Sequence, residues 1–325
     1  MPNIEKRILG KSGIEVTKIG VGLWAIGGDE WGEVDDRESL NMIDAALDLG
    51  INFFDTADVY GMGHSEKLLG QAMKGRRDRF IVATKIGWVD FDRDNQVSQY
   101  DTVEKLIAGV ESNLERLQTD YVDVIQCHID FRESNMEVFV EGFQKLQAQG
   151  KVRAYGVSTS DFDYLQAFNA DNEAATLQID YSILNRTPEE NIFPYTMENN
   201  LGVLVRGPLA MGLLTGKFSK DTRFEDGDFR QNWIENEDEY QIFLNDLEKV
   251  EKLKPLGNDE RSLAQLAIQF SMQHPAVTLA IPGAKRISQL KENVKTALMP
   301  ELTPEEIAVI DSITPPGGGR KIWPA

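Results

Sequence analysis

Residues 122–158 read VDVIQCHIDFRESNMEVFVEGFQKLQAQGKVRAYGVS, and this stretch predicts the class of fold. Two short, mainly apolar runs, 122–128 and 152–158, have the length and composition of strands. Between them, residues 136–149 show the longer pattern of a helix. A strand, a helix and a second strand in this order form a βαβ unit, in which the two strands lie parallel.

The same alternation extends over most of the chain. The expected strands are 19–22, 52–55, 80–85, 122–128, 152–158, 177–181, 202–206 and 278–281. The expected helices are 37–49, 65–73, 102–117, 136–149, 161–169, one that opens with a capping box at Thr187, 237–256, 262–273, 287–298, and one with a capping box at Thr303. Eight repeated βα units close into a barrel, so the sequence predicts an α/β fold, a (β/α)₈ TIM barrel.

Two additions to the barrel are also expected. Residues 4–9 and 13–17 flank a turn signal and predict an N-terminal β-hairpin. A long insertion separates strands seven and eight, and its polar, irregular part, 218–236, is expected to cross the mouth of the barrel. Because no linker or fixed-period repeat interrupts the pattern, residues 1–325 are predicted to form a single domain.

Composition limits the classes of function. A net charge of −19 argues against nucleic acid as a partner, although a local basic pocket can still hold one phosphate. The single cysteine, Cys127, permits no intramolecular disulfide, and no run is apolar enough for a signal peptide or a membrane span. We therefore expect a cytoplasmic protein with no membrane partner. The three histidines lack the spacing of metal ligands, so no metal site is predicted.

Four proton-handling residues fall where this fold places its active sites, at the carboxyl ends of the strands. Asp55 ends the second expected strand, Tyr60 follows it, Lys85 ends the third and His128 ends the fourth. Each alone has an ordinary explanation, such as a solvated lysine on the rim or a packed tyrosine. Together at one end of the barrel, the four residues favour a catalytic site.

The set suits the reduction of a carbonyl group. Hydride addition builds negative charge on the carbonyl oxygen, which must then be protonated. Tyr60 can supply that proton, and a nearby Lys85 ammonium is expected to lower its pKa from about 10. Asp55 would keep Lys85 charged, and His128 could orient the carbonyl oxygen.

The ordered motifs resemble the aldo-keto reductase superfamily, in particular the bacterial branch related to the potassium-channel β subunits. The resemblance covers nearly the whole chain. It is carried by DTADVYG at 55–61, Thr84-Lys85, Cys127-His128, GVS at 156–158, Gln178, GPL at 207–209, GLLTGK at 212–217, IPGA at 281–284 and Glu292-Asn293.

The resemblance implies an enzyme with Asp55, Tyr60, Lys85 and His128 as the catalytic tetrad and Tyr60 as general acid or base. It also implies a nicotinamide cofactor. Ser158 and Gln178 would bind the carboxamide and Arg206 would stack on the ring. Pro208, Leu209, Gly212 and Lys217 would follow the pyrophosphate. Gly283, Lys285, Arg286, Gln289, Glu292 and Asn293 would bind the adenosine end.

Three positions depart from the family pattern. Thr159 stands where Asn is frequent, Arg206 where an aromatic residue is frequent, and Gly283-Ala284 where the aldose reductase branch has Lys-Ser. Because Lys285 and Arg286 can still meet a ribose 2′-phosphate, we favour NADPH as the cofactor, with NADH as the other candidate.

The expected substrate is a small carbonyl compound or sugar. Trp24 and Trp88 are placed to wall its pocket, and Trp233 in the insertion could close it. The resemblance implies a monomer, and nothing in the sequence excludes an oligomer. Two other readings stay open: an NADPH-binding regulatory or redox-sensing subunit with little turnover, and a Schiff-base enzyme that uses Lys85.

Overall fold

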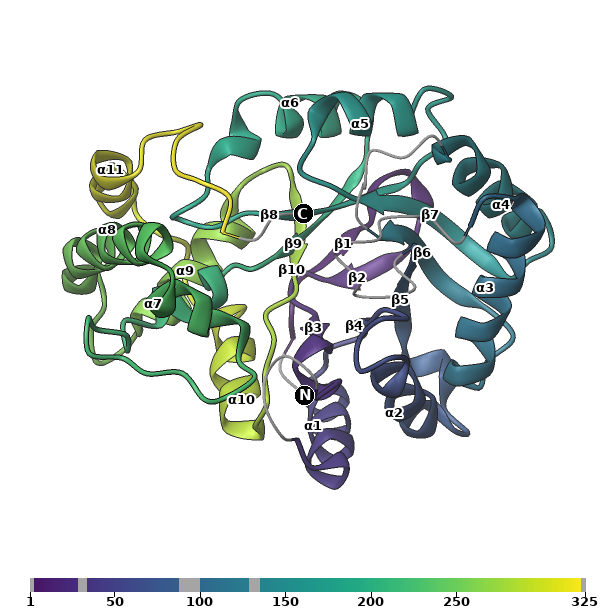
Figure 1. Cartoon of the computed structure of the whole chain (residues 1–325), viewed down its shortest axis with the longest axis horizontal. Coiled ribbons are helices and arrows are strands. Elements are labelled where there is room, and N and C mark those ends of the chain that lie inside the picture. The colour runs from purple at the N-terminus through teal and green to yellow at the C-terminus, as the bar shows by residue number, and fades with distance from the viewer. Residues whose placement is uncertain (1–2, 29–33, 88–99, 129–134, 323–325) are drawn as a thin grey trace.

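A closed parallel sheet forms the centre of the structure. The computed structural model of the chain describes residues 3–28, 34–87, 100–128 and 135–322. Its large sheet has the spatial order β10-β9-β8-β7-β6-β5-β4-β3, with parallel pairing throughout. Parallel bridges join Ile19 to Ala280 and Gly22 to Gly283, so the two edges of the sheet meet. Helices surround this sheet (Figure 1), and the predicted TIM barrel is confirmed.

The strands follow the sequence prediction within two residues at every end. They are β3 (Val21–Gly22), β4 (Phe53–Asp55), β5 (Ile81–Ile86), β6 (Val122–His128), β7 (Val152–Ser158), β8 (Thr176–Asp180), β9 (Gly202–Arg206) and β10 (Val277–Ala280). Nearly every strand residue is buried, because the outer face lies under helices and the inner face fills the barrel.

The helices cover the outer face of the sheet, either directly or by packing on another helix. They are α1 (Asp36–Asp48), α2 (His64–Met73), α3 (Val103–Leu117), α4 (Met136–Ala148), α5 (Phe162–Phe168), α6 (Ile192–Glu198), α7 (Asn232–Glu235), α8 (Glu237–Leu253), α9 (Leu263–Gln273), α10 (Ile287–Thr296) and α11 (Pro304–Ile313). Short 3₁₀ turns are η1 (Gly10–Ser12), η2 (Trp24–Ile26), η3 (Arg77–Arg79), η4 (Thr187–Glu189), η5 (Ala210–Thr215), η6 (Phe229–Gln231) and η7 (Lys254–Leu256). Among the described residues, no helix combines the length and apolarity needed to cross a lipid bilayer.

The N-terminal hairpin closes one end of the barrel. Strands β1 (Lys6–Ile8) and β2 (Glu15–Thr17) pair antiparallel, as predicted. Leu9, Ile14 and Val16 are buried in one apolar cluster with inward-facing strand residues such as Phe53 and Val124. Because the hairpin fills the amino-terminal end of the strands, the polar residues at the carboxyl end face the open mouth.

Two local predictions were wrong. The capping box at Thr187 does not form, because the Thr187 hydroxyl donates to Asn185 Oδ1 at 2.7 Å and only a 3₁₀ turn follows. The α-helix α6 begins later, at Ile192. The stretch 218–236 is not wholly irregular, since it contains η6 and α7. The capping box at Thr303 does form, with Glu306 as its partner.

Candidate active site

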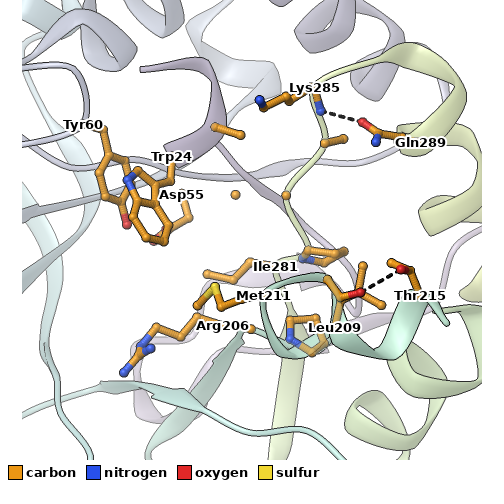
Figure 2. Close-up of a pocket in the computed structure, with 18 of the residues that line it drawn as sticks. Trp24, Asp55, Tyr60, Arg206, Leu209, Met211, Thr215, Ile281, Lys285 and Gln289 are labelled. Atoms are coloured by element: carbon orange, nitrogen blue, oxygen red, sulfur yellow. Dashed lines mark hydrogen bonds between the residues drawn. The ribbon is translucent and has the colours of Figure 1, made fainter. Parts of the chain in front are cut away.

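A cavity of about 400 Å³ lies at the carboxyl ends of the strands, within the size range of small-ligand sites. Tyr60, Trp24 and Asp55 line one end of it, and Lys285 and Gln289 line the other (Figure 2). The cavity is therefore elongated, with titratable residues from the barrel interior at one end and a basic loop at the other.

At the interior end, Lys85 forms hydrogen bonds to the groups around it. Strands β4 and β5 are neighbours and point Asp55 and Lys85 into the barrel. Lys85 Nζ donates to Asp55 Oδ2 at 2.7 Å, to the Thr56 carbonyl at 2.9 Å and to Tyr60 Oη at 3.0 Å. The lysine side chain is completely buried. Three acceptors thus match the three ammonium hydrogens, and the bonds to Asp55 and Tyr60 connect the carboxylate to the phenol through the lysine.

A tight turn brings Tyr60 over Lys85. The loop after β4 packs so closely on Gly27 that a Cβ atom at Gly61 would lie 2.2 Å from the Gly27 carbonyl oxygen, and Gly61 has a φ of 59°. The Tyr60 ring contacts the His128 ring edge-on, with centroids 5.9 Å apart. On its other side it stacks with Trp24 at 6.0 Å. The phenol is therefore held between β6 and the end of β3.

Burial and neighbouring charges shift the pKa values of Tyr60 and Lys85. Burial raises the pKa of Tyr60; the Lys85 ammonium opposes this rise and Asp55 adds to it. Lys85 thus acts in the expected direction, but the expectation of a lowered tyrosine pKa was wrong because burial outweighs it. Burial lowers the pKa of Lys85, yet Asp55 and Tyr60 more than compensate and the net pKa is raised.

His128 is neutral at physiological pH. Burial lowers its pKa well below the usual value, and the positive charges of Lys85 and Arg206 act in the same direction. A neutral imidazole can hydrogen-bond to an oxygen but is a poor source of a proton. Of the residues around Lys85, Tyr60 is therefore the one placed and protonated to act as an acid.

A polar network behind β5 holds the Lys85 backbone, and the sequence analysis missed it. Thr84 Oγ1 and Arg116 Nε both donate to Glu66, at 2.6 Å each. Arg116 also donates to Asn113 Oδ1 at 2.8 Å, and Asn113 Nδ2 donates to the Lys85 carbonyl at 3.2 Å. Asn113, buried on the apolar side of α3, was the signal available in the sequence.

Most of the residues assigned to a cofactor meet at the cavity. Those that line it are Ser158, Gln178, Arg206, Pro208, Leu209, Gly212, Lys217, Gly283, Lys285 and Gln289. Three do not line it. Arg286 is exposed at the N-cap of α10, the Glu292 carboxylate accepts from Gln265 at 2.9 Å, and Asn293 donates to the Gly283 carbonyl at 3.2 Å. Asn293 therefore supports the loop that lines the cavity.

Arg230 is a cavity residue that the sequence analysis did not find. It comes from η6 in the long insertion and donates to both carboxylate oxygens of Asp228, at 2.8 and 2.5 Å. It also donates to the Met211 carbonyl at 3.1 Å, and its guanidinium lies over the Phe224 ring at 4.9 Å. Met211, Thr215 and Phe218 line the same wall. The insertion thus adds to the basic end a guanidinium whose charge is paired with Asp228.

The three tryptophans assigned to the substrate have different positions. Trp24 lines the cavity and stacks with both Tyr60 and Phe229. Trp233 is buried against Phe224, Phe229 and Phe243, and it is not among the residues that line the cavity. Trp88 lies outside the described residues. Within the described residues, no group of three or more His, Cys, Asp or Glu side chains could hold a metal ion.

Known proteins are similar to this chain in sequence and in fold. Residues 18–315 match the Aldo/keto reductase family. The chain is 36% identical to Aldo-keto reductase YhdN of Bacillus subtilis over 89% of its own length and 87% of the relative's. It is 32% identical to a probable voltage-gated potassium channel subunit beta of Oryza sativa, over 94% and 95% of the two chains.

A solved aldo-keto reductase from Klebsiella pneumoniae in complex with NADPH superposes with a TM-score of 0.74. It is 26% identical to the chain and the match covers 97% and 96% of the two proteins. These matches confirm the resemblance to the family and to members related to the potassium-channel β subunits.

Proposed function

Because the chain belongs to the aldo/keto reductase family, we propose that it is an NADPH-dependent oxidoreductase that reduces the carbonyl groups of aldehydes or ketones, or oxidises the corresponding alcohols or sugars. One observation carries the proposal: the Lys85 ammonium is hydrogen-bonded to both Asp55 and Tyr60 beside a neutral His128, at one end of an elongated cavity.

The cavity residues fit a nicotinamide dinucleotide phosphate. At the interior end, Ser158 and Gln178 supply a hydroxyl and an amide for the carboxamide, and Arg206 lies beside them. Towards the other end, Lys217 and Lys285 supply positive charges for phosphate groups, and Arg230 supplies a guanidinium that it shares with Asp228. Lys285 stands on the loop before α10, so it is the residue we assign to the ribose 2′-phosphate. The NADPH complex of the Klebsiella pneumoniae relative supports this choice of cofactor.

The side chains at the interior end carry out the proton transfer. When bound, the reduced nicotinamide supplies a hydride to the carbonyl carbon. His128 orients the carbonyl oxygen, and Tyr60 donates its phenolic proton to that oxygen. The Lys85 ammonium, 3.0 Å from Tyr60 Oη, stabilises the phenolate that remains, and Asp55 keeps the ammonium in place. In the oxidation direction, the Tyr60 phenolate accepts the proton of the alcohol.

The geometry of Lys85 argues against a Schiff-base mechanism. A nucleophilic lysine must lose its proton, but Asp55 and Tyr60 raise the pKa of Lys85. Its three hydrogen bonds also engage the ammonium hydrogens, one of which would have to be lost before the nitrogen could attack a carbonyl carbon. We therefore assign Lys85 to charge stabilisation.

The test is binding followed by turnover. We expect the purified protein to bind NADPH, by quenching of its fluorescence, more tightly than NADH. We also expect it to consume NADPH, by loss of absorbance, with at least one member of a panel of aldehydes, ketones, aldoses and ketoses. Failure to bind either cofactor would overturn the proposal.

The likeness to a channel subunit makes a regulatory role the second candidate. Tight NADPH binding with no turnover on the whole panel would move the assignment to an NADPH-binding regulatory subunit.

A further inference from the structure

Gln178 contacts the catalytic carboxylate directly. Its Nε2 atom donates to Asp55 Oδ1 at 2.7 Å, while the other oxygen, Asp55 Oδ2, accepts from Lys85 at 2.7 Å. Gln178 and Asp55 are 1% and 2% exposed, so this bond is shielded from water and strongly directional.

The bond crosses the barrel. Gln178 is on β8 and Asp55 is on β4, which stand four places apart in the closed order of eight strands and therefore on opposite walls. The Gln178 side chain thus connects the wall that carries Ser158 and Arg206 with the wall that carries Lys85 and Tyr60.

Asp55 fixes which way the Gln178 amide faces. Burial raises the pKa of Asp55, and the Lys85 ammonium opposes this rise. Paired with Lys85, the Asp55 carboxylate accepts a hydrogen bond on each oxygen, so it binds the amide nitrogen of Gln178 and leaves the carbonyl oxygen for the cavity. That oxygen can accept a hydrogen bond from an N–H group of a ligand and cannot donate to a carbonyl.

The proposed function already assigns Gln178 to the nicotinamide carboxamide. We infer that Gln178 is also a positioning residue: its amide N–H holds the Asp55 carboxylate towards Lys85, and this bond leaves its carbonyl oxygen as the atom that faces the NH₂ group of the carboxamide. This inference rests on the proposed function. It makes recognition of the cofactor and orientation of the proton donor depend on one side chain. It also gives Asp55 a second role: by binding the amide nitrogen of Gln178, Asp55 determines that Gln178 accepts a hydrogen bond from the ligand.

A cofactor analogue tests the orientation of the amide without turnover. 3-Acetylpyridine adenine dinucleotide phosphate replaces the NH₂ group of NADP⁺ by a methyl group and keeps the carbonyl oxygen. We expect the unmodified protein to bind NADP⁺ roughly tenfold more tightly than this analogue, by protein fluorescence, because the analogue leaves the Gln178 oxygen without a donor.

Four variants test whether the preference for NADP⁺ over the analogue comes from Gln178. Gln178→Met should remove this preference. Asp55→Asn should reduce it, because an asparagine can donate a hydrogen bond and so allows the Gln178 amide to turn. Asp55→Asn should have no further effect on the ratio when Gln178→Met is already present. Ser158→Ala is the control: it should weaken both compounds and keep their ratio. Equal affinities in the unmodified protein, or an Asp55→Asn variant with an unchanged ratio, would overturn the orientation.

The pH profile tests the link to the proton donor. Without the Gln178 N–H group, the negative charge of Asp55 is less stabilised and repels the Tyr60 phenolate more strongly, so the pKa of Tyr60 rises. In Gln178→Met, the rising limb of kcat/KM for alcohol oxidation should therefore move to higher pH by roughly half to one unit. Ser158→Ala should leave the limb in place. An unmoved limb in Gln178→Met would overturn the positioning role. If the unmodified protein shows no turnover, the proposed function fails, and the affinity ratios still decide how Gln178 is oriented.

Discussion

The two ends of the cavity are built differently. At the interior end, the Asp55 and Lys85 side chains come from adjacent strands, are buried, and are joined by hydrogen bonds before any ligand binds. At the other end, Lys285 and Gln289 lie on a loop and a helix start, are more exposed, and face Arg230 from the insertion. The first end is part of the barrel core, whereas the second is assembled from connections between elements.

This difference predicts where substitutions act. Groups fixed by strands can stabilise a developing charge without rearranging, so their loss should reduce turnover more than binding. Charges on exposed loops attract phosphate groups but are weakened by salt, so their loss should reduce affinity and leave the chemistry unchanged. Substitutions at the two ends should therefore separate kcat from Kd.

The largest effect is expected from Tyr60→Phe. Phenylalanine keeps the ring that stacks on Trp24 and removes the proton that the reaction needs. We expect kcat for carbonyl reduction to fall about 10³-fold, with the Kd for NADPH changed less than about threefold. Steady-state kinetics and a fluorescence titration measure the two quantities.

Tyr195→Phe is a matched control, because the Tyr195 hydroxyl accepts a hydrogen bond from Asn169 and does not line the cavity. Turnover close to normal in Tyr60→Phe would remove the acid assignment. A loss confined to NADPH affinity would mean that the interior end binds the cofactor without taking part in the chemistry.

The barrel, and the meeting of Asp55, Tyr60, Lys85 and His128 at one end of it, could be predicted from the sequence because both follow from local patterns. Eight strand–helix repeats give the fold, and the fold alone brings Asp55, Lys85 and His128 to the same end. The turn after β4 is also local, and it places Tyr60 beside Lys85. The prediction failed at Thr187, where a hydroxyl hydrogen bond to Asn185 replaced the expected cap. That bond depends on how the Thr187 side chain is rotated.

Contacts between distant segments could not be predicted in the same way. Gln178 was assigned to a cofactor, but its bond to Asp55 joins residues 123 positions apart across the barrel. Arg230 is attached to the cavity through Asp228 and Met211, and no spacing rule connects these three residues. Trp233 packs against aromatic residues of the insertion itself. The first outcome depends on how far a side chain reaches across the barrel, and the other two depend on how the insertion folds back on it.

The second prediction concerns the basic end. Lys285→Ala should weaken NADPH binding roughly tenfold and NADH binding much less, because NADH lacks the 2′-phosphate. Arg286→Ala should have a smaller effect, since Arg286 is exposed and does not line the cavity. Lys291→Ala, which removes the same charge from α10 itself, should change neither affinity. Equal losses for both cofactors in Lys285→Ala would remove the 2′-phosphate assignment.

The smallest effect, and the sharpest contrast between the ends, is the pH dependence of His128. A histidine whose pKa is well below its usual value of about 6.5 stays neutral until the pH falls below that lowered pKa. Reduction at saturating NADPH should therefore show no step between pH 6 and 8. Arg206→Met removes one of the two positive charges that lower the pKa of His128, so it should move the acid limb of the profile upward, although burial and Lys85 hold it below 6.5. A step near pH 6.5 that disappears in His128→Asn would show that the imidazole titrates freely, and that the interior end is not the dry, fixed site that its hydrogen bonds indicate.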